Sequence, residues 1–163
     1  MRARLSALAR AHTLTLTKTS DASRSSEQPT KIHALIRTIL LPFDVEDESS
    51  RVEISGPDIV VAGNSVTSLA MLLHEFAANA AKYGALSSPS GRIAIECRDE
   101  GEQFVLVWSE DGGPAVSQTH VEGFGTLLGQ VTVRSQLGGE ITRLWMPQGL
   151  TIRLAVAKDR LSA

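Results

Sequence analysis

The sequence has little cysteine and no long apolar run, and each scarcity excludes a class of protein. The single cysteine, Cys97, cannot form an internal disulfide, so we expect a buried thiol in a reducing compartment. No apolar stretch approaches the roughly 20 residues that span a bilayer, and Arg4 and Arg10 interrupt the apolar core that a signal peptide needs. These absences predict a cytoplasmic protein with no membrane contact by this segment.

The sequence also lacks an excess of charge of either sign. Lysine and arginine number 16 against 18 aspartate and glutamate residues, which gives a net charge of -2 with the signs interspersed. That distribution lacks the basic patch of a nucleic-acid-binding protein, but it allows a phosphate-bearing small molecule, which needs only local groups. A length of 163 residues with 42% apolar content suits one compact domain and a short appendage.

The N-terminal part is predicted to be that appendage. Apolar residues at spacings of three and four predict an amphipathic helix over residues 2–18, and the serine-rich run after it is typical of a linker. We therefore expect a helical piece at 1–19, a linker at 20–30 and the main domain at 31–160.

The main domain is predicted to intermix helices with strands. Thr30 is a suitable N-cap for a helix that ends before Pro42. Alternating and helical patterns predict hairpins at 51–61, 91–110 and 140–157, and further helices at 65–83 and 126–137. This order favours an α+β fold, a two-layer sandwich with helices packed on one face of a mixed, mainly antiparallel sheet.

The long helix at 65–83 has two different faces. Its apolar stripe predicts packing on a core and consists of Val66, Leu69, Leu73, Phe76, Ala77 and Ala80. The opposite side presents Glu75, Asn79 and Lys82 at spacings of four and three residues. Such a polar face is compatible with simple solvation as well as with a binding site, so its meaning depends on the rest of the chain.

Two glycine clusters favour a binding site. Glu110 ends a predicted strand and precedes one cluster, and Gly123-Phe124-Gly125 precedes a helix at Thr126, where unpaired N–H groups favour phosphate. The side-chain oxygen of Asn79 suits Mg²⁺, which bridges phosphate oxygens. Glu75 is placed to orient or deprotonate a reacting hydroxyl, and Lys82 to meet phosphate charge. With Glu110 as an acceptor for an exocyclic amine, these groups predict a site for a Mg²⁺-nucleotide.

Two other motifs are excluded by spacing. His74-Glu75 begins like the zinc protease pattern His-Glu-x-x-His, but Ala78 stands where the second histidine is required. The glycines at 123, 125 and 129 follow a loop with the spacing Gly-x-Gly-x-x-x-Gly, which differs from the dinucleotide-binding motif. Neither a zinc protease nor a Rossmann domain is therefore expected.

Residues 31–158 resemble the ATP-binding domain of the GHKL superfamily, and within it the HWE group of bacterial sensor histidine kinases. The segment 73–86, Leu-His-Glu-Phe-Ala-Ala-Asn-Ala-Ala-Lys-Tyr-Gly-Ala-Leu, resembles the asparagine box of that group. The segment 108–114, Trp-Ser-Glu-Asp-Gly-Gly-Pro, resembles the first glycine box, and Gly123-Phe124-Gly125 matches the second. The letters that name the group appear as His74, Trp108 and Glu110.

The resemblance implies a Bergerat-type ATP-binding fold with ATP and Mg²⁺ as ligands. It implies Glu75, Asn79 and Lys82 as catalytic residues, with Asn79 also the metal ligand. The ATP-binding residues that it implies are Asn79, Lys82, Tyr83, Glu110, Gly112, Gly113, Gly123, Gly125, Thr126 and Leu127. Glu110 stands where other kinases of the superfamily have the aspartate that reads the adenine amine, and the segment between Pro114 and Gly123 would be the ATP lid.

The implied function is that of a protein-histidine kinase domain, which transfers the γ-phosphoryl group of ATP to a histidine for relay to a response regulator. None of His12, His33, His74 and His120 has the sequence context of a phosphoacceptor, and residues 4–12 resemble the end of an acceptor hairpin. We therefore expect the accepting histidine to lie outside this chain, which would then not phosphorylate itself. The full protein is expected to pair as a homodimer through the N-terminal helix.

Two alternatives remain at this stage. One is a non-catalytic relative for histidine phosphotransfer or docking, which the intact glycine boxes and asparagine box disfavour. The other is a GHKL serine kinase that acts on a partner protein, which the Trp-x-Glu pattern disfavours. Trp108 alternates with core residues, so packing is its expected main role, and the sequence predicts no role for His74.

Overall fold

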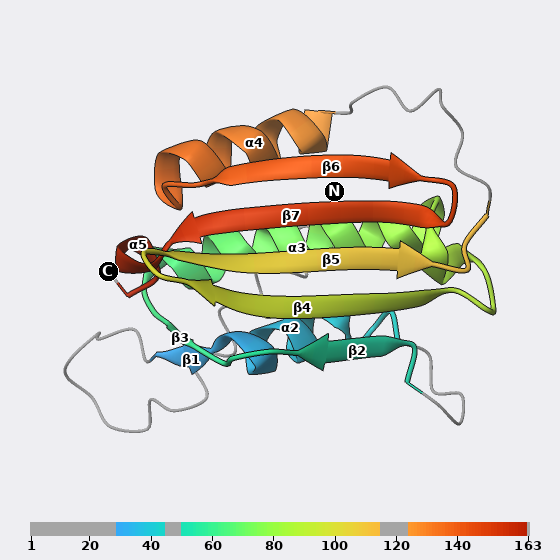
Figure 1. Ribbon diagram of the computed structural model, residues 1–163, viewed down its shortest axis with the longest axis horizontal. Coiled ribbons are helices and arrows are strands. Elements are labelled where there is room, and N and C mark those ends of the chain that lie inside the picture. The colour runs from blue at the N-terminus through green and yellow to red at the C-terminus, as the bar shows by residue number, and fades with distance from the viewer. Residues whose placement is uncertain (1–28, 45–49, 115–123, 163) are drawn as a thin grey trace.

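A five-stranded sheet with the order β2-β4-β5-β7-β6 forms the centre of the fold (Figure 1). The computed structural model describes residues 29–44, 50–114 and 124–162, with the backbone alone for 124–128. Strand β2 runs parallel to β4, and the remaining neighbouring pairs are antiparallel, which confirms the predicted mixed sheet. The strands are β2 (Val52–Ser55), β4 (Arg92–Glu100), β5 (Gln103–Asp111), β6 (Glu140–Met146) and β7 (Gly149–Ala157).

The helices cover one face of this sheet. Figure 1 shows α3 behind β5 and β7, α2 near β2 and β4, and α4 alongside β6. The helices are α2 (Ile32–Leu40), α3 (Asn64–Lys82), the 3₁₀ turn η1 (Ala85–Ser87), α4 (Phe124–Gln136) and the short α5 (Lys158–Leu161). Among the helices of the described residues, none combines the length and the apolar character needed to cross a membrane.

The core lies between the sheet and the helices. The predicted apolar stripe of α3 is buried, which confirms its assignment, and it packs with the inward side chains of α2. Alternate residues of the central strands complete the core because successive side chains in a strand point to opposite faces. These inward residues include Ile93, Ile95 and Cys97 of β4, Phe104, Leu106 and Trp108 of β5, and Ile152, Leu154 and Val156 of β7.

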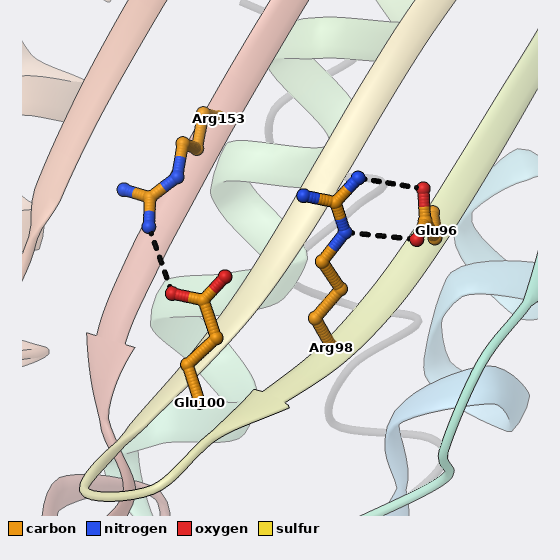
Figure 2. A network of polar contacts seen from close by, with 4 residues as sticks. All are labelled: Glu96, Arg98, Glu100 and Arg153. Carbon is orange, nitrogen blue, oxygen red and sulfur yellow. Dashed lines mark hydrogen bonds and ion pairs between the residues drawn. The ribbon is translucent and has the colours of Figure 1, made fainter.

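The opposite face of the sheet carries charged side chains (Figure 2). Arg98 binds both carboxylate oxygens of Glu96, at 2.8 and 3.0 Å, and Arg153 binds Glu100 at 3.1 Å. Each of these side chains is more than 40% exposed, so water and salt screen both pairs and they contribute little to stability. Their main consequence is a solvated face opposite the helices.

Two of the three predicted hairpins are confirmed. Strands β4 and β5 are joined by Gly101-Glu102, and the positive φ of 77° at Gly101 suits a two-residue turn. Strands β6 and β7 pair from Glu140 opposite Ala155 to Met146 opposite Gly149, and the turn at Pro147-Gln148 joins them.

The predicted hairpin at 51–61 is wrong, although both of its strands form. Strand β2 lies parallel to β4, with Val52 opposite Ile93, whereas β3 (Val60–Val61) pairs with β1 (Thr30–Lys31) in a separate two-stranded sheet. At the end of β2 the chain passes so close to β4 that a Cβ atom on Gly56 would lie 1.9 Å from the Cys97 carbonyl oxygen. Alternation of apolar residues predicts a strand but does not specify its partner.

The N-cap predicted at Thr30 is also wrong, because Thr30 belongs to β1 and α2 begins at Ile32. The first N–H groups of α2 bind a distant loop instead. Ile32 donates to the Ile59 carbonyl at 2.9 Å, and His33 donates to the Asp58 carboxylate at 3.1 Å. The predictions for 1–19, and for the linker as far as residue 28, lie outside the described residues.

Candidate functional site

The polar stripe of α3 forms as predicted over its last two turns. Asn79 and Lys82 are exposed and Glu75 is half-buried. Because residues three and four apart share one side of a helix, the three side chains lie in one row. The helix ends with Lys82, and the N–H of Tyr83 still donates to the Asn79 carbonyl at 2.8 Å. The Tyr83 side chain, 63% exposed, therefore follows directly on the end of the row.

Glu110, at the end of β5, is bound to the loop that follows α3. Its Oε1 accepts a hydrogen bond from the N–H of Ala85 at 3.0 Å, and its Oε2 accepts one from the Trp108 indole N–H at 3.0 Å. Only 6% of Glu110 is exposed. The carboxylate thus connects the sheet to the backbone just beyond the row of polar residues on α3.

The glycines around Glu110 allow this close approach. A Cβ atom at Gly84 would lie 2.1 Å from Glu110 Oε1, and one at Gly113 would lie 2.9 Å from the backbone of Ala85. Gly112 has a φ of 72°, and a Cβ atom there would lie 2.6 Å from the Ser90 carbonyl oxygen. The first glycine cluster therefore has a packing role against the loop after α3.

Arg51 also binds the loop that follows α3, and this contact was not anticipated from the sequence. Its guanidinium donates to the carbonyl oxygens of Gly91 at 2.9 Å and Ala85 at 3.1 Å, and also to that of Ser88. A planar guanidinium with five donors suits several carbonyls at once. The partners lie 34 to 40 residues away along the chain, so no local pattern could have indicated the contact.

Burial controls the ionisation of Glu110. Desolvation raises the pKa of the Glu110 carboxyl above its ordinary 4.5, while the hydrogen bonds from Ala85 and Trp108 act in the opposite direction. The protonated form of Glu110 is thus favoured more in the folded chain than in the unfolded chain. Protonation of Glu110 therefore stabilises the folded state below pH 4.5, and this stabilisation is lost as the pH rises through the raised pKa of the folded state.

We expect carbon-13 NMR of the Glu110 side-chain carboxyl to show a titration midpoint above 4.5 in the folded chain. The same carboxyl should titrate near 4.5 in urea, where burial is removed. A midpoint at or below 4.5 in the folded chain would contradict the dominance of desolvation.

His74 and Trp108 are, with Glu110, the residues that resemble the letters naming the HWE group, and both make ring contacts. Trp108 is fully buried, as expected for a packing residue, and meets Phe76 edge to face with ring centroids 5.7 Å apart. His74 is half-buried and meets Phe43, just beyond α2, in a similar geometry at 5.6 Å. The hydrogen bond from Trp108 to Glu110 was missed, although a spacing of two residues places both on one face of a strand.

The second glycine cluster is described only in part. Gly123 lies outside the described residues, and α4 begins at Phe124, two residues before the predicted start. Gly125, Thr126 and Leu127 consequently lie within the first turns of α4, where the backbone N–H groups have no helical partner. The third glycine of the cluster, Gly129, is buried against α3, where a Cβ atom would lie 3.1 Å from Leu72.

The donors on α3 fit a magnesium ion better than a metal held by protein alone. Within the described ranges, no group of three or more His, Cys, Asp or Glu side chains is arranged to hold a metal. What α3 offers is one exposed carboxamide, Asn79, beside a carboxylate and an ammonium group. Mg²⁺ commonly takes one or two protein ligands and completes its shell with water and phosphate oxygens.

Comparison with known sequences places this chain beside histidine kinases. Residues 1–58 match the family model described as HWE histidine kinase. The chain is 38% identical over 156 residues to Blue-light-activated histidine kinase 1 of Erythrobacter litoralis, a match that covers 94% of this chain and 41% of that protein. It is 37% identical over 155 residues to the blue-light-activated histidine kinase of Rhizobium johnstonii, with coverage of 94% and 42%. The chain thus spans less than half the length of these relatives.

Solved structures of histidine kinases share the fold. The histidine kinase domain of a blue-light activated kinase from Erythrobacter litoralis superposes with a TM-score of 0.70 at 15% identity, over 97% of this chain and 76% of that one. The catalytic domain of histidine kinase ThkA superposes with a TM-score of 0.62 at 16% identity, over 80% of this chain and 96% of that one. These likenesses confirm the predicted α+β architecture.

Proposed function

Because this chain matches the HWE histidine kinase family model and is similar in sequence to histidine kinases, as its motifs indicated, we propose that residues 31–160 are the ATP-binding catalytic domain of a two-component sensor kinase. In this proposal the domain binds ATP with Mg²⁺ and transfers the γ-phosphoryl group to the histidine of an acceptor hairpin. A response regulator then takes the phosphoryl group. We assign residues 1–19 to the end of the hairpin and 20–30 to the linker.

The observation that carries this proposal is the junction of α3 with β5. The row of Glu75, Asn79 and Lys82 ends where the backbone of Ala85 binds the buried carboxylate of Glu110. Groups suited to a metal, to phosphate and to an amine therefore lie on adjoining parts of the fold. A solvated helix face alone would not require this buried connection to the sheet.

The residues of α3 are assigned to the reacting end of the nucleotide. Asn79 offers its side-chain oxygen to Mg²⁺, which when bound offsets the charge of the β- and γ-phosphates. Lys82 adds positive charge on the same side of the helix. Glu75, one turn before Asn79, orients the imidazole of the accepting histidine or receives a proton from it. Catalysis then arises from positioning and charge neutralisation, with no covalent intermediate on this domain.

The remaining residues are assigned to the base and the phosphates. The carboxylate of Glu110 accepts a hydrogen bond from the exocyclic amine of adenine, and Tyr83 lies between base and phosphates. The backbone of Gly112 and Gly113, which directly follow β5, approaches the nucleotide. The N–H groups at the start of α4 face the phosphates, because a helix N-terminus favours anions. The residues involved in these two backbone contacts are Gly112, Gly113, Gly123, Gly125, Thr126 and Leu127.

The proposal predicts that the purified chain binds a fluorescent ATP analogue saturably in the presence of Mg²⁺, and that EDTA weakens this binding. Unlabelled ATP should displace the analogue, whereas AMP, which lacks the β- and γ-phosphates, should displace it poorly. Absence of binding by the folded chain in Mg²⁺ would contradict the proposal and favour a non-catalytic relative. An acid-stable phosphoserine on a partner protein would favour the serine kinase alternative.

A further inference from the structure

The indole of Trp108 donates a hydrogen bond to the carboxylate of Glu110 inside the core. The distance from Nε1 to Oε2 is 3.0 Å, and the two residues are 0% and 6% exposed. Hydrogen bonds to a charged group are about twice as strong as neutral ones, and breaking one in a buried site leaves an unsatisfied polar atom. This contact therefore restricts the carboxylate more than packing alone would.

The other carboxylate oxygen is confined as well. Oε1 accepts a hydrogen bond from the N–H of Ala85 at 3.0 Å, and it fits beside Gly84 because a Cβ atom there would lie 2.1 Å from it. An ionised carboxylate has about four lone-pair sites, so two donors leave roughly two for a ligand. Glu110 is thus held in one orientation with capacity to accept a further hydrogen bond.

We propose that Trp108 is a positioning residue for base recognition, because its indole N–H holds the Glu110 carboxylate in the orientation that accepts the 6-amino group of adenine and rejects a 6-oxo purine. This inference rests on the proposed ATP site. A 6-oxo group presents lone pairs to the carboxylate, so the two acceptors repel each other. A carboxyl that is free to rotate or to take up a proton could instead donate to the oxo group, and the discrimination would fall.

The surroundings of Trp108 make a selective test feasible. Its ring lies edge to face with Phe76 at 5.7 Å, and Ile95 and Ile152 are its partners on the adjacent strands. Trp108→Phe keeps an aromatic ring for these contacts and removes the N–H. Ile152→Val removes one methylene from the directly adjacent strand position and no polar atom, so it serves as the matched control for loosened packing.

The experiment compares the dissociation constants of ATP and inosine triphosphate, which carries a 6-oxo group, in the presence of Mg²⁺. We expect the unsubstituted chain to prefer ATP and Trp108→Phe to lower this preference about tenfold, mainly through weaker ATP binding. Ile152→Val should leave the ratio unchanged within about twofold. An unchanged ratio in Trp108→Phe with ATP still bound would overturn this inference alone. No ATP binding by the unsubstituted chain would overturn the proposed function as well.

A second measurement covers the case in which Trp108→Phe does not fold. The chain has two tryptophans, and Trp145→Phe assigns their indole N–H signals in nitrogen-15 NMR. Saturating Mg²⁺-ATP should shift the Trp108 indole signal, and Mg²⁺-inosine triphosphate should shift it less. An indole signal that does not respond to saturating ATP would overturn the inference.

Discussion

Asn79→Ala is expected to weaken ATP binding in Mg²⁺ by roughly 100-fold, since even residues that only support a metal ligand contribute 10- to 100-fold to metal affinity. The folded state should be unaffected. Asn79 is exposed in the last two turns of α3, and among the described residues its side chain forms no hydrogen bond. Alanine also has a higher helix propensity than asparagine, so any change in stability should be small and favourable.

The measurement is a titration of a fluorescent ATP analogue in Mg²⁺, with the urea unfolding midpoint recorded for the same samples. Asn64→Ala is the matched control, because Asn64 is also an exposed asparagine of α3 but lies at the opposite end of the helix. It should bind the analogue like the unsubstituted chain. Equal affinity of the Asn79 and Asn64 variants would contradict the proposed role of Asn79 as a Mg²⁺ ligand.

Gly91→Ala is expected to destabilise the fold by about 3 kcal/mol or more, the upper end of what overpacking costs. A Cβ atom at Gly91 would lie 1.7 Å from the Ala85 carbonyl oxygen and 2.5 Å from its carbon. These are backbone atoms, so they cannot rotate away as the end of a side chain can. Because the N–H of Ala85 binds Glu110, displacement of this loop should also weaken ATP binding.

Gly101→Ala provides the control for this substitution. Gly101 has a φ of 77° in the turn between β4 and β5, and a Cβ atom there would meet nothing within 4 Å. It should cost only the roughly 1–2 kcal/mol of a left-handed residue and leave ATP affinity unchanged. Urea unfolding measures the stability of both variants, and ATP titration measures their affinity for ATP. Similar stabilities and affinities for the two variants would show that the loop tolerates the added atom.

The elements predicted best are those whose signal is local. The apolar stripe of α3 and the alternation in β4 and β5 repeat within one segment, and each was found with boundaries close to those observed. The row of Glu75, Asn79 and Lys82 follows from helix geometry alone. Recognition of these residues as a site depended on their resemblance to a known motif, since a polar helix face has no unique meaning by itself.

The elements predicted wrongly depend on distant contacts. Strand β2 pairs with β4 rather than with its neighbour β3, and α2 receives its cap from Asp58 rather than from Thr30. Arg51, for which no contact was predicted, also depends on distant partners, since it binds three carbonyl oxygens of the loop after α3. In each case two or more partners were chemically suitable along the chain, and only the complete packing selects one.

By itself, the sequence determined the α+β class, the long helix and the residues that its polar side presents, because hydrophobic periodicity and helix spacing act over a few residues. Only the tertiary structure decided which groups bind and surround the Glu110 carboxylate. It placed the carboxylate between the Trp108 indole and the Ala85 N–H and left too little room for a Cβ atom at Gly84. The physical reason is that burial and hydrogen-bond geometry arise only when segments distant in the chain meet, and these two properties set the orientation and the pKa of Glu110.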